Sequence, residues 1–163
     1  MIRFTSIAIT LGGLLSHWCP RVLADSPTPL LRLAVVDDSG SMEGQRAETV
    51  RAELLKVSRQ LPPSLTHPFG IITFGSTAAT VRWFTDLPSF ERAVTGLDGN
   101  SGGTNIAAGL QEAAKALRSR TDSASLCILL YTDGEDGNTA GILQAESQLD
   151  AIFAQRQQVG LSQ

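Results

Sequence analysis

The stretch LAVVDDSGSM, residues 33–42, decides the fold of this chain, because an apolar run changes abruptly into a polar cluster. The apolar run is typical of a strand that is buried on both faces of a parallel sheet. The polar cluster follows the carboxyl end of that strand, which is where ligands bind in open α/β sheets. Asp37, Ser39 and Ser41 occupy every second position, so one carboxylate and two hydroxyls can converge on a single point. Such hard oxygen donors suit Mg²⁺ or Mn²⁺.

Outward from this stretch, strand-like and helix-like segments alternate along the chain. The hydrophobic pattern predicts strands over 30–36, 69–74, 80–84 and 126–131, and helices over 45–61, 88–97, 106–118 and 140–157. The short link between the second and third strands predicts an antiparallel hairpin. This alternation indicates an α/β fold, namely a Rossmann-like, mostly parallel and doubly wound sheet with one antiparallel edge strand and helices on both faces. The charged residues of the first helix, Arg46 among them, are expected to face solvent.

The N-terminus has the features of a secretory signal peptide. It has a positive residue at Arg3, a nine-residue apolar stretch over 7–15, and small residues before a cleavage site between Ala24 and Asp25. We therefore expect residues 1–24 to be a signal peptide, 25–29 a lead-in and 30–163 the domain. The mature chain is expected to be exported, to the periplasm, the cell surface or the medium, without a membrane span.

The bulk composition narrows the classes of partner. The chain of 163 residues carries a formal net charge of −3, which gives no electrostatic basis for binding nucleic acid. After cleavage one cysteine, Cys127, would remain inside an apolar run, where a buried and inert thiol is expected.

Two later loops carry further oxygen donors. The glycine-rich loop 99–105 presents Thr104 at the start of a helix, and the loop 132–137 presents Asp133 directly after a buried strand. If strands 30–36 and 126–131 are parallel neighbours, the loops that follow them lie at the same edge of the sheet. The glycines let the Thr104 loop fold close to that edge. Two carboxylates and three hydroxyls would then surround one cation, with a coordination position left for an outside ligand. The other loop acids, Asp38, Glu135 and Asp136, are expected to be solvated.

At this point the sequence resembles the von Willebrand factor A, or integrin I-like, domain family. The metal-ion-dependent adhesion site of that family has a D-x-S-x-S segment, a later Thr after Gly-Gly, and an Asp in T-D-G, and all five positions occur here in order: Asp37, Ser39, Ser41, Thr104 and Asp133. The resemblance covers nearly all of residues 30–153. It implies that the two serines bind Mg²⁺ or Mn²⁺ directly and that the two aspartates bind through water or orient the ligands. The threonine would change between direct and water-mediated binding of the ion. A Glu or Asp of another protein would complete the shell, giving metal-dependent protein binding in adhesion or complex assembly and no enzymatic activity.

One departure from the family pattern concerns the C-terminus. Family members continue with two further strands and a final helix, whereas this sequence stops at Gln163. The resemblance therefore predicts a C-terminally incomplete domain in which the outer edge of strand 126–131 is unpaired. A truncated, non-functional fragment is one alternative that this departure leaves open.

Two other interpretations compete with the adhesion-type site. The acid pair Asp37-Asp38 after a strand resembles a Mg²⁺-binding phosphoacceptor receiver domain, with Asp86 as the candidate phosphorylation site. That class also needs a lysine after a late strand, but Lys56 and Lys115 both fall on predicted helices. In the second interpretation, the carboxylates and hydroxyls cap their loops without any metal.

Overall fold

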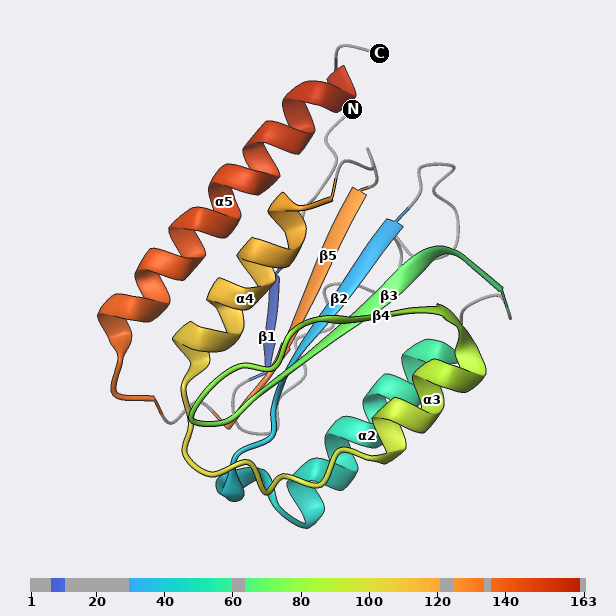
Figure 1. Cartoon of the computed structure of the whole chain (residues 1–163), viewed down its shortest axis with the longest axis vertical. Helices are drawn as coiled ribbons and strands as arrows, with labels where there is room; N and C mark the ends of the chain where they lie inside the picture. The colour runs from blue at the N-terminus through green and yellow to red at the C-terminus, as the bar shows by residue number, and fades with distance from the viewer. Residues whose placement is uncertain (1–6, 11–29, 60–63, 121–124, 134–135, 162–163) are drawn as a thin grey trace.

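A five-stranded sheet with the strand order β1-β5-β2-β3-β4 forms the centre of the described part of the chain (Figure 1). The computed structural model describes residues 7–10, 30–59, 64–120, 125–133 and 136–161. Within these ranges the strands are β1 (Ile7–Thr10), β2 (Leu30–Asp37), β3 (Ser64–Phe74), β4 (Arg82–Asp86) and β5 (Ser125–Tyr131). The helices are α2 (Gln45–Ser58), α3 (Leu87–Thr95), α4 (Ile106–Arg118) and α5 (Thr139–Leu161), with a short 3₁₀ helix η1 (Gly40–Met42).

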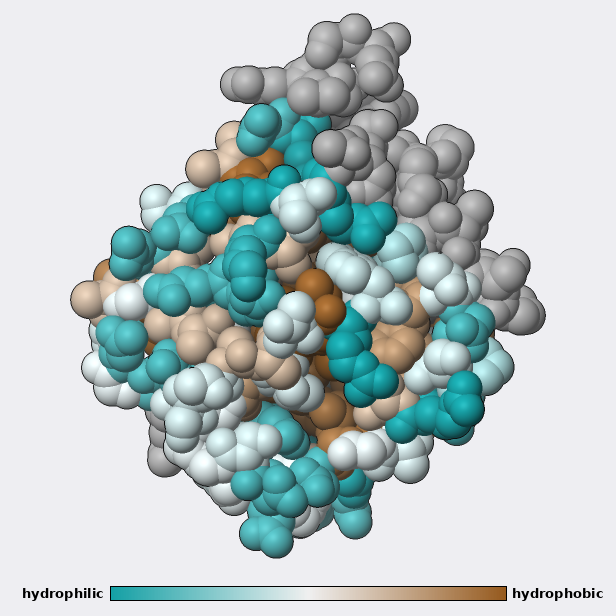
Figure 2. Space-filling view, in the orientation of Figure 1, coloured by the Kyte–Doolittle hydropathy of each residue, from teal (hydrophilic) through white to brown (hydrophobic). Residues whose placement is uncertain are grey.

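Helices cover both faces of the sheet, and each face has its own apolar core. Helices α4 and α5 pack on one face, where Leu33 and Val35 of β2 meet Leu110 of α4 and Leu149 of α5. Helices α2 and α3 pack on the other face, against the alternate residues of the same strands. Residues 33–36 of β2 are buried on both faces, which explains why this part of the strand is continuously apolar. Figure 2 shows that hydrophilic side chains cover much of this view, while apolar surface is visible between the two helix layers.

The predicted architecture is confirmed. Strands β2, β3 and β5 pair in parallel, and β4 pairs with β3 antiparallel at one edge of the sheet. Helix α4 has the predicted bounds, but α2 ends at Ser58, three residues before the predicted end, where the Ser58 hydroxyl donates to the Leu55 carbonyl oxygen at 2.8 Å. Strand β3 begins at Ser64, earlier than predicted, because Ser64 pairs with Asp86 of β4.

In the full chain the edge beside β5 is paired, whereas the unpaired edge predicted for the domain 30–163 stays a prediction. Ile7–Thr10 forms β1, which pairs with β5 in parallel in the register Ile7 to Ile128 through Thr10 to Tyr131. The sequence pattern assigned these residues to a signal peptide, and an apolar run of this kind also suits a strand. Cleavage after Ala24 falls outside the described residues and stays a prediction, as does the incompleteness of the domain at its C-terminus. No helix of the described segments is both long and apolar enough to cross a membrane.

Gly70 in the middle of β3 makes room for a large side chain of the neighbouring strand. A Cβ atom at Gly70 would lie 2.5 Å from Cζ3 of Trp83 and 2.7 Å from Cδ1 of Leu33. The absence of a side chain therefore lets the indole of β4 lie across β3, which is a frequent reason for a glycine inside a strand.

We expect Gly70→Ala to destabilise the protein by about 1–3 kcal/mol, because the new methyl group overpacks Trp83 and Leu33. Urea unfolding measures the change. Gly137→Ala is the matched control, since a Cβ there would meet nothing within 4 Å. Equal stability of the Gly70→Ala variant and the wild type would contradict the account of this packing.

Removal of residues 1–24 should leave the outer edge of β5 unpaired, because β1 is lost with them. We expect the chain that starts at Asp25 to bind a hydrophobic dye or to aggregate more than the full chain does. Dye fluorescence and sedimentation of both chains measure this. A shortened chain that is monomeric, melts cooperatively and binds no dye would contradict the expectation.

Candidate metal centre

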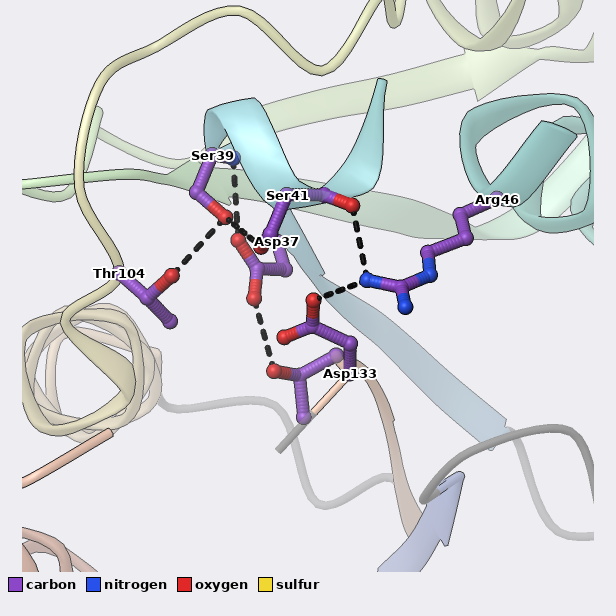
Figure 3. Close-up of polar contacts among 7 residues, drawn as sticks. Asp37, Ser39, Ser41, Arg46, Thr104 and Asp133 are labelled. Atoms are coloured by element: carbon purple, nitrogen blue, oxygen red, sulfur yellow. Dashed lines mark hydrogen bonds and ion pairs between the residues drawn. The ribbon is translucent and has the colours of Figure 1, made fainter. Parts of the chain in front are cut away.

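The predicted site residues come from segments that meet where the parallel strands have their carboxyl ends. This border of the sheet is the edge at which the site lies. Val36 of β2 lies beside Tyr131 of β5, so Asp37 and the residues after Tyr131 emerge next to each other. The loop before α4 reaches the same edge, where the Gly40 N–H donates to the carbonyl oxygen of Gly102 at 2.9 Å. The convergence of the three predicted loops is therefore confirmed (Figure 3).

Three hydroxyl groups form a row at the centre of this edge. The Thr104 hydroxyl donates to Oγ of Ser39 at 3.0 Å, and Oγ of Ser39 shares a hydrogen bond with Oγ of Ser41, also at 3.0 Å. Ser39 is buried, Thr104 is half-buried and Ser41 is exposed, so the row runs from the interior towards solvent. Three hydroxyl groups this close together can donate hydrogen bonds to each other, or their oxygens can bind one cation together.

The carboxylate of Asp37 is buried and fixed on both of its oxygens. Oδ1 accepts from the backbone N–H of Ser39 at 3.0 Å, and Oδ2 accepts from the Thr132 hydroxyl at 2.7 Å. Asp37 therefore connects its own loop to the end of β5 and holds the backbone that carries Ser39. Sequence reasoning missed Thr132, whose partner lies 95 residues away along the chain.

Asp133 lies at the same edge but bonds to none of the predicted site residues in the described structure. Its Oδ2 accepts from Nη1 of Arg46 at 2.6 Å, while its Oδ1 is buried without a hydrogen-bond partner. The same Nη1 donates to the carbonyl oxygen of Ser41 at 2.9 Å. The expectation that Arg46 merely faces solvent is wrong, although its side chain is 59% exposed. Helical spacing placed it on the outer face of α2 and gave no information on a partner 87 residues away.

Asp38 has a structural role that its assignment as a solvated loop charge missed. Its Oδ1 accepts from the Gly99 N–H at 2.8 Å and its Oδ2 from the Ser101 hydroxyl at 2.6 Å. Its carbonyl oxygen also accepts from the Ser101 N–H at 2.6 Å. Asp38 thus holds the glycine-rich loop beside the loop after β2. This contact helps to place Thr104 next to Ser39.

Asp136 was also expected to be solvated, and this expectation is wrong. Its Oδ2 accepts from the Ile106 N–H at 2.7 Å, and its Oδ1 accepts from the Asn138 N–H at 2.7 Å. A carboxylate at the N-terminus of α4 also interacts favourably with the helix dipole. Asp136 therefore connects the loop after β5 to the start of the helix that follows Thr104. Glu135 lies outside the described residues.

Glycines allow the close approach of these loops. A Cβ at Gly75, directly after β3, would lie 2.2 Å from the carbonyl oxygen of Ser101. Gly99 has a φ of +72°, a conformation that favours glycine, and a Cβ there would lie 2.7 Å from the backbone nitrogen of Glu43.

The receiver-domain interpretation does not agree with the position of Asp86. Asp86 pairs with Ser64 at the start of β3, whereas Asp37 pairs with Phe74 at the end of the same strand. Ten residues of strand separate the two positions by roughly 30 Å. Asp86 instead caps α3. The hydrogen bond that its carboxylate accepts from the Ser89 N–H lowers the pKa of the Asp86 carboxyl.

The donor atoms at this edge are compatible with a hard divalent cation. They comprise three hydroxyl oxygens and two carboxylates, with a buried oxygen of Asp133 that has no hydrogen-bond partner. A buried acceptor without a partner is unfavourable, so a cation or water that binds it would stabilise the site. The described segments hold no group of three or more His, Cys, Asp or Glu side chains that could bind a metal ion.

Comparison with known proteins agrees with this fold. The family model described as von Willebrand factor type A domain matches residues 33–135, more than half of the chain. The chain belongs to the von Willebrand factor type A domain family. The match begins in β2 and ends in the loop after β5, so it includes all five predicted site residues.

Relatives of this von Willebrand factor type A domain come from large proteins and from bacteria. The bovine (Bos taurus) inter-alpha-trypsin inhibitor heavy chain H4 is 30% identical over 142 residues, which are 80% of this chain and 15% of the relative. BatB from Bacteroides thetaiotaomicron has a TM-score of 0.59 at 21% identity over 71% of this chain and 58% of its own. The pilus adhesin SpaC from Lactobacillus rhamnosus GG has a TM-score of 0.53 at 24% identity over 68% of this chain and 15% of its own. The two structural matches show the shared fold, and the chain spans only a part of each of these proteins.

We expect Asp38→Ala to destabilise the protein by about 2 kcal/mol, because it leaves the Gly99 N–H and the Ser101 hydroxyl without their charged acceptor. Urea unfolding measures the loss, and hydrogen exchange should show faster exchange over residues 99–104. Asp98→Ala is the control, since Asp98 is exposed and accepts a hydrogen bond from the Asn100 side chain alone among the described contacts. Equal effects of the two substitutions would contradict the role of Asp38.

Proposed function

We propose that this domain binds Mg²⁺ or Mn²⁺ at the edge of its sheet and uses the ion to bind an acidic side chain of another protein. The observation that supports this most directly is the hydroxyl row of Thr104, Ser39 and Ser41 beside the partnerless Oδ1 of Asp133. Hard oxygen ligands favour these two ions over softer metals.

Each residue has a distinct part in the proposed binding. Ser39 and Ser41 would be the direct ligands, because their hydroxyls are neighbours and their loop is held by Asp37. Asp37 already has both oxygens bonded, so its role is to orient the loop and to supply negative charge. Thr104 and Asp133 would complete the protein ligands. The bound ion would supply a positive charge that attracts a carboxylate, and the exposed position of Ser41 leaves that side open to a partner.

The proposed setting is adhesion or complex assembly outside the cytoplasm. The pilus adhesin SpaC and the type V pilus tip protein Mfa5 share the fold, at 24% and 17% identity. The predicted signal peptide points to the same setting. The segment that they share with this chain is 36% of Mfa5 and 15% of SpaC, and their location in pili motivates the proposed setting. We propose no catalytic role.

Isothermal titration calorimetry with Mg²⁺ and Mn²⁺ tests the metal site. We expect saturable binding to one site in the full chain, at least a tenfold weakening in Ser39→Ala, and no change in Ser147→Ala, where the replaced serine is exposed on α5. Capture of proteins from the source organism's surface fraction, with Mg²⁺ and with a chelator, then tests the partner. Absence of metal binding, or equal binding by wild type and Ser39→Ala, would contradict the proposal, as would capture that is unaffected by the chelator and by Ser39→Ala.

A further inference from the structure

The ion pair of Arg46 with Asp133 lies inside the proposed metal site. Nη1 of Arg46 contacts Oδ2 of Asp133 at 2.6 Å and the carbonyl oxygen of Ser41 at 2.9 Å (Figure 3). One cationic group therefore connects the loop after β2 with the loop after β5. These are two of the three loops that supply the proposed ligands.

The two partners of this ion pair differ in their exposure. The Asp133 side chain is 8% exposed, and its other oxygen is buried without a partner. The Arg46 side chain is 59% exposed and extends from the second residue of α2. The carboxylate is therefore a fixed part of the site, whereas the guanidinium can move into solvent without disturbing the core.

We propose that Arg46 is a tethered cation that competes with the divalent ion for Asp133. The inference rests on the proposed metal site and adds a residue that sets its affinity. Arg46 compensates the buried negative charge of Asp133 in the absence of metal, through a charge-assisted hydrogen bond. A divalent ion at the same carboxylate has to displace the guanidinium or accept repulsion from it. Arg46 therefore lowers metal affinity and raises the cation concentration at which the site fills.

The test compares four full-length chains: wild type, Arg46→Gln, Arg46→Lys and Arg59→Gln. Arg46→Gln removes the charge, and Arg46→Lys retains it without the planar guanidinium. Arg59→Gln removes a charge at the opposite end of the same helix, roughly 20 Å away, and controls for net charge. Calorimetry with Mg²⁺ gives the affinity. Thermal melting in chelator and in saturating Mg²⁺ gives the stabilisation that the metal confers.

We expect Arg46→Gln to bind Mg²⁺ roughly threefold to tenfold more tightly than wild type, as expected when a competing ion pair is removed. Arg46→Lys and Arg59→Gln should stay close to wild type. In chelator Arg46→Gln should melt at a lower temperature than wild type, because Asp133 loses its counter-charge. The rise in melting temperature on adding Mg²⁺ should be larger for Arg46→Gln than for wild type.

Two different failures can be distinguished. If all four chains bind Mg²⁺ equally, the competitor role of Arg46 is wrong while the metal site stands. If Arg46→Gln binds more weakly, Arg46 supports the metal and the inference is likewise overturned. If neither wild type nor Arg46→Gln binds Mg²⁺, the proposed function fails together with this inference, and the arginine is a permanent counter-ion of Asp133.

Discussion

The parallel pairing of β2 with β5 is the constraint on which the rest of the site depends. Its register sets Val36 beside Tyr131, and both strands end at the same edge of the sheet. The buried hydrogen bond from the Thr132 hydroxyl to Asp37 at 2.7 Å joins the two ends. Because side chains alternate along a strand, a shift of one residue would turn Asp37 towards the opposite face and separate it from Thr132. The apolar residues of β2, buried on both faces, hold this register by packing against the helices.

From residue 30 onwards, the sequence was sufficient for the order of the main strands and helices and for the convergence of the three loops. Apolar runs followed by polar clusters mark β2 and β5, and ligands bind where such strands end. The sequence could not show contacts that depend on three-dimensional proximity. Arg46 lies on the exposed side of α2 by helical spacing, and Asp38 lies between two predicted ligands. Both have partners more than 60 residues away. The strand character of Ile7–Thr10 was also missed, since an apolar N-terminal run fits a signal peptide equally well.

The edge of the sheet combines a rigid inner part with an adjustable outer part. Asp37, Asp38 and Asp136 have fixed hydrogen-bond partners on neighbouring loops, and they hold the backbone around the hydroxyl row. Ser41 and Arg46 lie further out and are exposed. In our account the inner carboxylates set the position of the ligands, while the outer arginine sets how strongly a cation is bound. Preorganised ligands on rigid elements are what a selective metal site requires.

Anomalous diffraction at the manganese absorption edge, from crystals of the full chain grown with Mn²⁺, tests the central claim most directly. We expect one anomalous peak within direct coordination distance of Oγ of Ser39 and Oγ of Ser41, with the guanidinium of Arg46 moved away from Asp133. A peak at another position, or no peak with Arg46 still bonded to Asp133, would contradict the assignment of this edge as a metal-dependent binding site.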